Sequence, residues 1–258
     1  GKTTSLRIIA GLERATSGKI LVENEDVTLL PATDRDVSMV FQSYALFPHM
    51  SVLENVSYGL KMINVPKEEF TEKSLETLKL VNLEGYENRM PSELSGGQQQ
   101  RVAVARAIVL KPKVLLFDEP LSNLDAKLRR QVREDIREIQ QKLGVTTIYV
   151  THDQEEALAI SDKVIVMNNA IIAQQGSPKE LYNFPKTKFV ANFIGDANVV
   201  KAEIINQNNN VYEIQLAEMK INIESDQKLE SSVSVSLRPE KITISKSPEE
   251  NSIHASVN

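Results

Sequence analysis

The sequence predicts an α/β domain with a parallel-sheet core, followed by a small antiparallel β domain. Four short runs are apolar on both faces, as in parallel strands that helices cover on either side. They are VSMVF (37–41), KVLLF (113–117), TTIYV (146–150) and KVIVM (163–167). After FIGDAN (193–198), apolar and polar residues alternate, which is typical of half-exposed antiparallel strands. We therefore expect one domain over 1–195 and a second over 196–258.

The stretch between the first two strands predicts helices. In SVLENV, Ser51 is followed three residues later by Glu54, which is the pattern of a helix capping box. Leu75, Leu78 and Val81 recur at a spacing that places them on one helical face. Since residues 51 to 111 contain no convincing strand, we expect a helical subdomain of about that extent inside the α/β domain.

The second domain is predicted from period-two patterns. Tyr212, Ile214 and Leu216 alternate with polar residues, and Val233, Val235 and Leu237 do the same. QNNN (207–210) supplies turn residues before the first of these strands. The last residues, NSIHASVN (251–258), have the character of an interrupted strand, so we expect this domain to be incomplete.

Composition narrows the class of protein. Of 258 residues, 41% are hydrophobic and 25% charged, which is ordinary for a soluble globular protein. A net charge of −5 argues against a nucleic-acid surface as the main function. The chain has no cysteine, which excludes disulfides and thiolate metal sites and suits a cytosolic protein. The longest apolar runs, such as VLLF and VIVM, are too short to span a bilayer.

The opening residues GKTT match the end of a phosphate-binding loop, G-x-x-x-x-G-K-[ST]. In that pattern the lysine reaches the β- and γ-phosphates and the hydroxyl ligates Mg²⁺. The residues that follow predict a helix whose N-terminal amides and dipole favour phosphate. Leu6, Ile9 and Ala10 would form its inward stripe. We expect the front of the loop to be missing from this chain.

Two acidic residues end a buried strand in VLLFDEP (114–120). Buried unpaired charges are costly, and acids at the carboxyl end of a parallel strand usually face a crevice that binds ligands. Asp118 would hold Mg²⁺ and Glu119 would polarise an attacking water. The structural alternative is that both acids begin a surface loop.

Two further stretches suggest contacts with anions. LSGGQQQR (94–101) places a serine and two glycines just before an amphipathic helix, where backbone amides can approach an anion. The alternative is a flexible linker with a helix cap. YVTHD (149–153) places His152 beyond another strand, at the sheet edge that carries Asp118. There the histidine either contacts a γ-phosphate or is a structural capping residue.

These motifs, in this order, resemble those of the nucleotide-binding subunits of ABC transporters over essentially the whole chain. GKTT is similar to the end of the Walker A loop, VLLFDE to Walker B, and LSGGQ to the signature that contacts ATP bound to the opposite subunit. Gln42 matches the Q-loop glutamine, Asp125 in SNLD (122–125) the D-loop, and His152 the switch histidine. The resemblance implies a P-loop ABC-type ATPase fold that uses ATP and Mg²⁺.

The resemblance also implies roles for individual residues. Glu119 would be the catalytic base, with His152 and Gln42 assisting. Mg²⁺ would be held by Thr3, Gln42 and Asp118. The residues implied to bind ATP are Gly1, Lys2, Thr3, Thr4, Gln42, Ser95, Gly96, Gly97, Gln98, Asp125 and His152. Those of the LSGGQ motif would serve the partner's ATP.

Within the family, the β domain with LRPEK (237–241) is similar to the OB-like accessory domain of importer ATPases for sugars, polyamines, iron and sulfate. The stretch 42–56 also resembles these importers, in which a groove receives a coupling helix of the permease. Leu46, Phe47, Met50 and Val52 would line that groove or, alternatively, belong to the core. The stretches 110–130 and 193–200 are most similar to ferric-iron importers, with a polyamine or sugar importer as the alternative.

The resemblance implies a homodimer, two permease subunits or domains and, indirectly, a substrate-binding protein, with no nucleic acid as a partner. The expected location is the cytoplasmic face of the inner membrane. Since the first Walker A residues and the adenine-stacking aromatic residue are absent, the chain by itself is expected to bind ATP poorly and to be inactive. Two other classes stay open: a soluble ABC-type ATPase acting on nucleic acid or ribosomes, and a regulatory module that binds a partner through its β domain.

Overall fold

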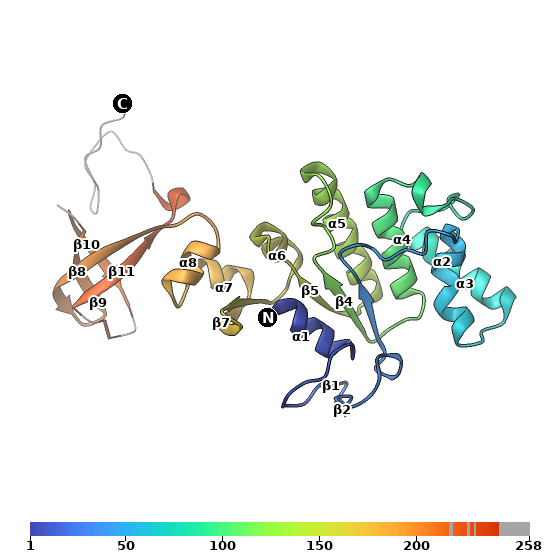
Figure 1. The fold of residues 1–258 in the computed structure, drawn as a ribbon. Helices are drawn as coiled ribbons and strands as arrows, with labels where there is room; N and C mark the ends of the chain where they lie inside the picture. The colour runs from blue at the N-terminus through green and yellow to red at the C-terminus, as the bar shows by residue number, and fades with distance from the viewer. Residues whose placement is uncertain (217–218, 226–227, 230, 243–258) are drawn as a thin grey trace. The chain divides into compact units, whose positions relative to one another are not determined.

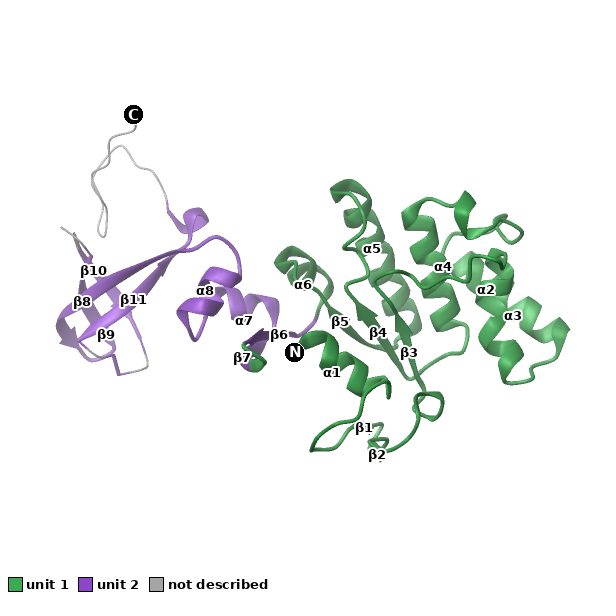
Figure 2. Ribbon diagram, in the orientation of Figure 1, with its two compact units in different colours: residues 1–161, 169–171 green, residues 162–168, 172–258 purple. Residues whose placement is uncertain are grey.

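The computed structural model describes residues 1–216, 219–225, 228–229 and 231–242 (Figure 1). The chain forms two compact units, coloured separately in Figure 2. Unit 1 contains residues 1–161 and 169–171, and unit 2 contains residues 162–168 and 172–258. Within the described residues, no helix is both long enough and apolar enough to cross a membrane. The domain boundary expected near residue 195 stays a prediction.

Unit 1 is built on a three-stranded parallel sheet in the order β3-β4-β5, which contains three of the four strands predicted for it. The strands are β3 (Val37–Val40), β4 (Val114–Asp118) and β5 (Thr146–Val150). Side chains of β4 alternate between two faces, because successive residues of a strand point in opposite directions. Leu116 packs with Leu6 of α1 (Lys2–Ile9), whereas Leu115 and Phe117 join the larger core on the other face. The stripe predicted for α1 is confirmed, since Leu6 and Ala10 are buried and Ile9 packs against them.

The larger core lies among α2 (Val52–Met62), α3 (Lys67–Leu80), α4 (Gly96–Ile108) and α5 (Ala126–Leu143). Residues 51 to 111, all of which the structure describes, contain α2, α3, α4 and the 3₁₀ helix η2 (Pro91–Glu93) but no strand. The predicted capping box is present, because Ser51 and Glu54 each accept a hydrogen bond from the other's backbone N–H.

The predicted apolar face of α3 is wrong in one position. Leu78 and Val81 are buried, but Leu75 is 41% exposed. Ser74 is fully buried instead. At about 100° per residue, positions 74, 78 and 81 share a narrower arc than 75, 78 and 81 do. The Ser74 hydroxyl donates to the Phe70 carbonyl within the helix, which makes its burial tolerable.

Of the four residues expected to line an exposed groove, one belongs to the core and a second packs against it. Val52 is fully buried, and Leu46 is partly buried and packs against the same cluster. Phe47 and Met50 are partly exposed. The Asn55 side chain, fully buried, accepts a hydrogen bond from Phe47 N and donates to three carbonyls of the loop 47–51, so it holds this loop in place.

Unit 1 also contains the short pair β1 (Leu21–Val22) and β2 (Glu25–Asp26), the 3₁₀ helix η1 (Ala32–Asp34) and α6 (Gln154–Ile160). The strands β1 and β2 were not predicted. With two residues each, they are too short to produce a period in the sequence.

The run 163–167 is a strand, but its predicted place in the parallel sheet is wrong. It forms β6 (Val164–Asn168), which pairs with β7 (Ile171–Gly176) in a separate two-stranded sheet. Asn169 and Ala170 connect them with positive φ angles of 48° and 63°. Such a two-residue connection makes a hairpin, whereas a parallel pair needs a long crossover.

Unit 2 continues with α7 (Pro178–Asn183), α8 (Lys188–Phe193) and an antiparallel sheet in the order β10-β9-β8-β11. The strands are β8 (Asn198–Asn208), β9 (Val211–Leu216), β10 (Met219–Glu224) and β11 (Ser232–Leu237), followed by the 3₁₀ helix η3 (Pro239–Lys241). Tyr212, Ile214 and Leu216 are buried, so the predicted alternation is confirmed. The strand expected over 251–258 lies outside the described residues.

Candidate functional site

The start of α1 lies at the carboxyl edge of the parallel sheet. Thr3 Oγ1 donates a hydrogen bond to Asp118 Oδ1 at the end of β4, over 3.1 Å. Lys2 Nζ donates to the Thr151 carbonyl just beyond β5, over 2.5 Å. The structure therefore brings GKTT together with the acidic strand end, as the sequence predicted. Gly1 and Thr4 belong to the same helix start, at the N-cap and in the first turn.

Asp118 and Glu119 point to different partners. The backbone of Glu119 is in the left-handed region, with a φ of 47°, and its N–H donates to the Val150 carbonyl. Non-glycine residues in this region are strained and occur often at functional sites. The turn directs Glu119 Oε2 to His152 Nδ1, 3.1 Å away, while Asp118 meets Thr3. The His152 side chain is 68% exposed, so it also faces solvent.

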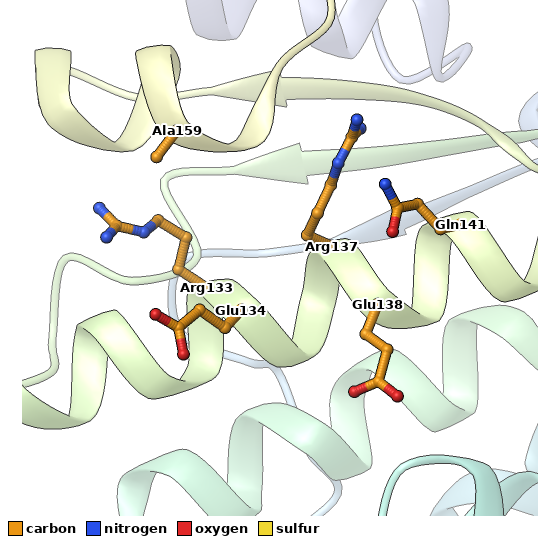
Figure 3. Close-up of a pocket in the computed structure, with 6 residues that line it drawn as sticks. All are labelled: Arg133, Glu134, Arg137, Glu138, Gln141 and Ala159. Carbon is orange, nitrogen blue, oxygen red and sulfur yellow. The ribbon is translucent and has the colours of Figure 1, made fainter.

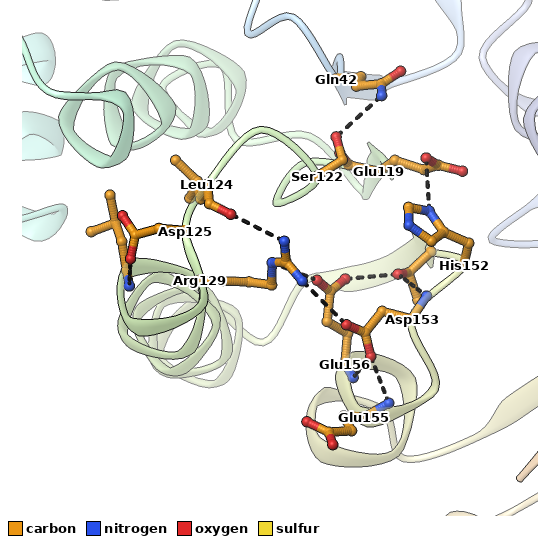
Figure 4. Close-up of polar contacts among 12 residues, drawn as sticks. Gln42, Glu119, Ser122, Leu124, Asp125, Arg129, His152, Asp153, Glu155 and Glu156 are labelled. Atoms are coloured by element: carbon orange, nitrogen blue, oxygen red, sulfur yellow. Dashed lines mark hydrogen bonds and ion pairs between the residues drawn. The ribbon is translucent and has the colours of Figure 1, made fainter. Parts of the chain in front are cut away.

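The predicted Q-loop and D-loop residues meet beside Glu119. Gln42 Nε2 donates to Ser122 Oγ, and Asn123 Nδ2 donates to the Gln42 carbonyl, both over 3.1 Å. Ser122 Oγ in turn donates to the Glu119 carbonyl. Figure 4 shows the contact of Gln42 with Ser122 and that of Glu119 with His152. The structure thus joins Gln42 to the strand end through Ser122. The metal role of Gln42 stays a prediction.

The serine and glycines of LSGGQ begin α4. Ser95 is the N-cap and forms a capping box with Gln98. A Cβ added to Gly96 would lie 3.0 Å from Leu124, and one added to Gly97 would lie 2.9 Å from Leu128. The glycines therefore permit close packing against the D-loop and α5. The contact of these residues with a partner's ATP stays a prediction.

The D-loop ends in the cap of α5. Asp125 is the N-cap, and its side chain accepts a hydrogen bond from Leu128 N over 3.0 Å. In the first turn that follows, Arg129 reaches Asp153 and Glu156 near His152 (Figure 4). The sequence motifs did not indicate Arg129, Asp153 or Glu156 as functional residues. The available signal was a cation near a helix N-terminus, where the helix dipole disfavours it unless a specific partner is present.

The residues at the sheet edge fit a magnesium ion. Mg²⁺ prefers oxygen ligands and is usually held by one or two protein groups together with water and substrate phosphates. The Thr3 hydroxyl and the Asp118 carboxylate, already in contact, supply such oxygens. In the part of the chain that the structure describes, no group of three or more acidic or histidine side chains forms a metal cage.

A separate pocket of about 350 Å³ lies between α5 and α6 (Figure 3). It is lined by Arg133, Glu134, Arg137, Glu138, Gln141 and Ala159. None of the predicted site residues lines it, and its charges are mixed. The chemistry described above therefore lies at the sheet edge and not in this pocket.

A helix start, an acidic strand end and a glutamate–histidine pair meet at one sheet edge, which is the arrangement expected of a P-loop nucleotide hydrolase. The comparisons with known proteins specify the class further. The family described as "ABC transporter" matches residues 1–122. The chain belongs to the ABC transporter family, as an ATP-hydrolysing subunit.

The curated relatives are similar over nearly the whole chain. The "Fe(3+) ions import ATP-binding protein FbpC" of Agrobacterium fabrum is 58% identical over 244 residues, which is 95% of this chain and 69% of that protein. Proteins of the same name from Brucella melitensis and Photorhabdus laumondii are 57% and 54% identical, with the same coverage.

Two solved structures confirm the predicted fold class. One is the dimeric post-hydrolysis state of the ATP-binding cassette MJ0796 bound to ADP and Pi, with 32% identity and a TM-score of 0.60. It covers 69% of this chain and 80% of that chain. The other is cbiO1 from Clostridium perfringens, part of the ABC transporter complex cbiONQ, also 32% identical, with a TM-score of 0.65. It covers 70% of this chain and 74% of that chain.

Proposed function

We propose that this chain is the ATP-hydrolysing subunit that powers import of ferric iron through a membrane permease. Ferric iron is proposed as the transported substrate because the relatives are named for Fe(3+) import. Their identity of 54 to 58% extends over 95% of the chain. The observation that carries the chemistry is the contact between Glu119 and His152 beside the Thr3–Asp118 pair.

ATP and Mg²⁺ bind at the carboxyl edge of the sheet. Lys2 and the free amides of α1 hold the phosphates, because a helix start and a lysine together favour anions. Thr3 and Asp118 are the protein ligands of Mg²⁺, with Gln42 as a further one. When bound, the ion neutralises charge on the phosphates.

Glu119 is the general base that accepts a proton from the attacking water. Its Oε2 lies 3.1 Å from His152 Nδ1, so the histidine orients the carboxylate and stands beside the γ-phosphate. The left-handed turn at Glu119 separates the two roles, because it directs one acid to the metal and the next to the water.

Two copies close head to tail over two ATP molecules, with residues 95–98 of each copy and its Asp125 serving the partner's ATP. Phe47 and Met50, both partly exposed, contribute to the permease contact. The assembly works at the cytoplasmic face of the inner membrane, next to a substrate-binding protein that delivers the cargo.

Replacing Glu119 with glutamine tests this proposal. In the full-length protein, ATP should still bind while turnover falls by roughly 10²-fold or more, the scale of a lost general base. Cells that carry only this variant should lose uptake of labelled ferric iron. Glu155→Gln is the matched control, because Glu155 is an exposed acid at the start of α6.

Turnover above half of wild type in Glu119→Gln would contradict the assignment of the base. Uptake of labelled polyamine or sugar, in place of iron, by cells with the wild-type protein would leave the ATPase assignment intact and replace the cargo.

A further inference from the structure

Arg129 joins two segments that flank the proposed site. Its guanidinium Nη2 donates to the Leu124 carbonyl over 3.0 Å, directly before Asp125 in the D-loop. Its Nη1 donates to Asp153 Oδ2 over 3.4 Å, directly after His152. Its Nε lies 3.8 Å from Glu156 Oε1. One side chain thus contacts both the D-loop and the segment that carries the histidine (Figure 4).

Glu156 is a buried carboxylate with partners on both sides. Its side chain is 4% exposed, and Oε2 accepts hydrogen bonds from Thr151 Oγ1 over 2.7 Å and from the Tyr149 hydroxyl over 3.3 Å. Burial, and secondarily the nearby Glu156 carboxylate, raises the pKa of the Tyr149 phenol, so this hydroxyl stays a donor. A buried charge requires such pairing, and Arg129 supplies the opposite charge.

The network fixes the backbone on both sides of His152. Thr151 is held at two atoms: its carbonyl accepts from Lys2, and its hydroxyl donates to Glu156 and accepts from Asp153 N. Asp153 also caps α6 through two backbone amides. With both neighbours held, the exposed His152 ring keeps its 3.1 Å contact with Glu119.

On the side of the D-loop, the network reaches the start of α4, the helix that begins within the LSGGQ motif. The carbonyl of Leu124 is held by Arg129, and a Cβ added to Gly96 would lie 3.0 Å from the Leu124 side chain. A displacement of Leu124 therefore disturbs both the Arg129 contact and the packing at the start of α4.

We propose that Arg129, through its pair with Glu156, is a positioning residue that couples the D-loop to His152. When a partner subunit displaces the D-loop, Arg129 transmits the displacement through Glu156 and Thr151 to the backbone of the histidine. Arg129 does not itself touch the reacting atoms. This inference rests on the proposed roles of Asp125, His152 and Glu119.

The test measures ATP turnover against ATP concentration in the full-length protein. Arg129→Met alone leaves a buried carboxylate unpaired and can unfold the protein, so the informative variants are Arg129→Lys and the double variant Arg129→Met/Glu156→Gln. Lysine keeps the positive charge but lacks the planar guanidinium, which contacts the Leu124 carbonyl and the carboxylates of Asp153 and Glu156. The double variant removes both charges together.

We expect kcat to fall by about tenfold to a hundredfold in both variants, the scale of small misplacements at a reacting centre. The KM for ATP should change by less than about threefold, because ground-state binding is left intact. Arg130→Lys is the matched control for Arg129→Lys, since the Arg130 side chain is 76% exposed and pairs with Glu134 one turn along the same helix. Glu155→Gln controls for Glu156→Gln.

Three results would overturn the inference. They are a kcat within twofold of wild type in both variants, a rise in KM with kcat unchanged, and a loss of turnover that only follows the loss of folded protein in thermal melts. Glu119→Gln and His152→Ala are measured in parallel. If these two also keep wild-type turnover, the proposed function fails; if they lose turnover while the Arg129 variants keep it, the coupling alone fails.

Discussion

At the scale of single residues, Arg35 shows how one side chain ends a helix inside the protein. It is 4% exposed, and its guanidinium donates to the carbonyls of Ile8 and Ile9 at the end of α1 and to those of Thr28 and Leu30. Carbonyls at a helix end lack partners within the helix, so a buried cation that satisfies them is stabilising. The same helix carries Lys2 and Thr3 at its start.

Arg35→Met should therefore destabilise unit 1. Losing the four hydrogen bonds of Arg35 costs about 2–4 kcal/mol in total, at a net value of about 0.5–1 kcal/mol for each. In a thermal melt, a protein of this size should lose roughly 4–16 °C. Arg14→Met is the control, because Arg14 is exposed. Equal melting temperatures for the two variants would show that Arg35 has no such role.

At the scale of elements, capping boxes set where several helices begin. Ser51 and Glu54 begin α2, Ser95 and Gln98 begin α4, and Ser177 and Glu180 begin α7. Each box depends on residues three apart, so the pattern is visible in the sequence. In two of the three boxes, those of α2 and α7, a glutamate carboxylate accepts the hydrogen bond from the N-cap backbone N–H. The stability of these two helix starts therefore depends on pH.

The backbone hydrogen bond from Ser51 lowers the pKa of Glu54 below its usual 4.5. A lowered pKa in the folded state gives a stabilisation that is present above the unfolded pKa and is lost as pH falls through the folded value. Urea unfolding at a series of pH values should show wild type more stable than Glu54→Gln near neutrality. This difference should shrink as pH falls below 4.5.

The control for this experiment is Glu76→Gln, at an exposed position on α3. A stability difference between wild type and Glu54→Gln that stays constant from neutral to acidic pH would mean that the carboxylate of Glu54 does not stabilise the helix start through its charge.

At the scale of the whole molecule, the proposed function depends on surfaces that one chain does not complete by itself. Ser95 and Gln98 close their side-chain hydrogen bonds on each other, while Lys2 and Thr3 bond to residues at the sheet edge. Under the proposed function, Ser95 and Gln98 of one copy contact the ATP that Lys2 and Thr3 of a second copy hold.

Ser95→Arg should abolish ATP-driven dimerisation and leave ATP binding by the single subunit intact. The arginine would place a bulky side chain where the amides at the start of α4 must approach phosphate. Light scattering of the Glu119→Gln/Ser95→Arg double variant with ATP measures the dimer. Because Ser95 is also a helix cap, Glu119→Gln/Ser177→Arg controls for the loss of a cap alone, which costs about 0.5–2 kcal/mol. A stable ATP-bound dimer of the Ser95 variant would refute the role in the partner's site.

Phe47→Asp should separate folding from permease contact. Phe47 is partly exposed, packs against Tyr58 with ring centroids 4.8 Å apart, and lies 5.3 Å from the Arg106 guanidinium. An aspartate would lose the ring contact but gain Arg106 as a neighbour, so the subunit should stay folded and lose roughly 1–2 kcal/mol of stability. It should no longer co-purify with the permease, because a buried carboxylate in that interface is costly.

Val52→Asp gives the opposite outcome for comparison, because Val52 is fully buried in the core and the change should unfold the subunit. If Phe47→Asp melts as Val52→Asp does, Phe47 is a core residue and the docking role is wrong.

The sequence by itself determined the features that depend on neighbours along the chain. Three of the four strands predicted for the parallel sheet, the capping box at Ser51, the helix after GKTT and the acidic end of β4 each follow from local pattern and were confirmed. The candidate nucleotide residues also followed from motifs, because each motif is a short run with its own chemistry. Where they meet was expected from the rule that parallel strands end at one sheet edge.

Only the tertiary structure decided the features that depend on contacts between distant residues. The hairpin of β6 and β7, the burial of Ser74 in place of Leu75 and the core position of Val52 each depend on which face a neighbouring element covers. The same holds for Arg129 and Glu156, 27 positions apart, whose pairing leaves no period or motif in the sequence. A buried charge is tolerated only where folding brings its partner to it, and no local pattern contains that information.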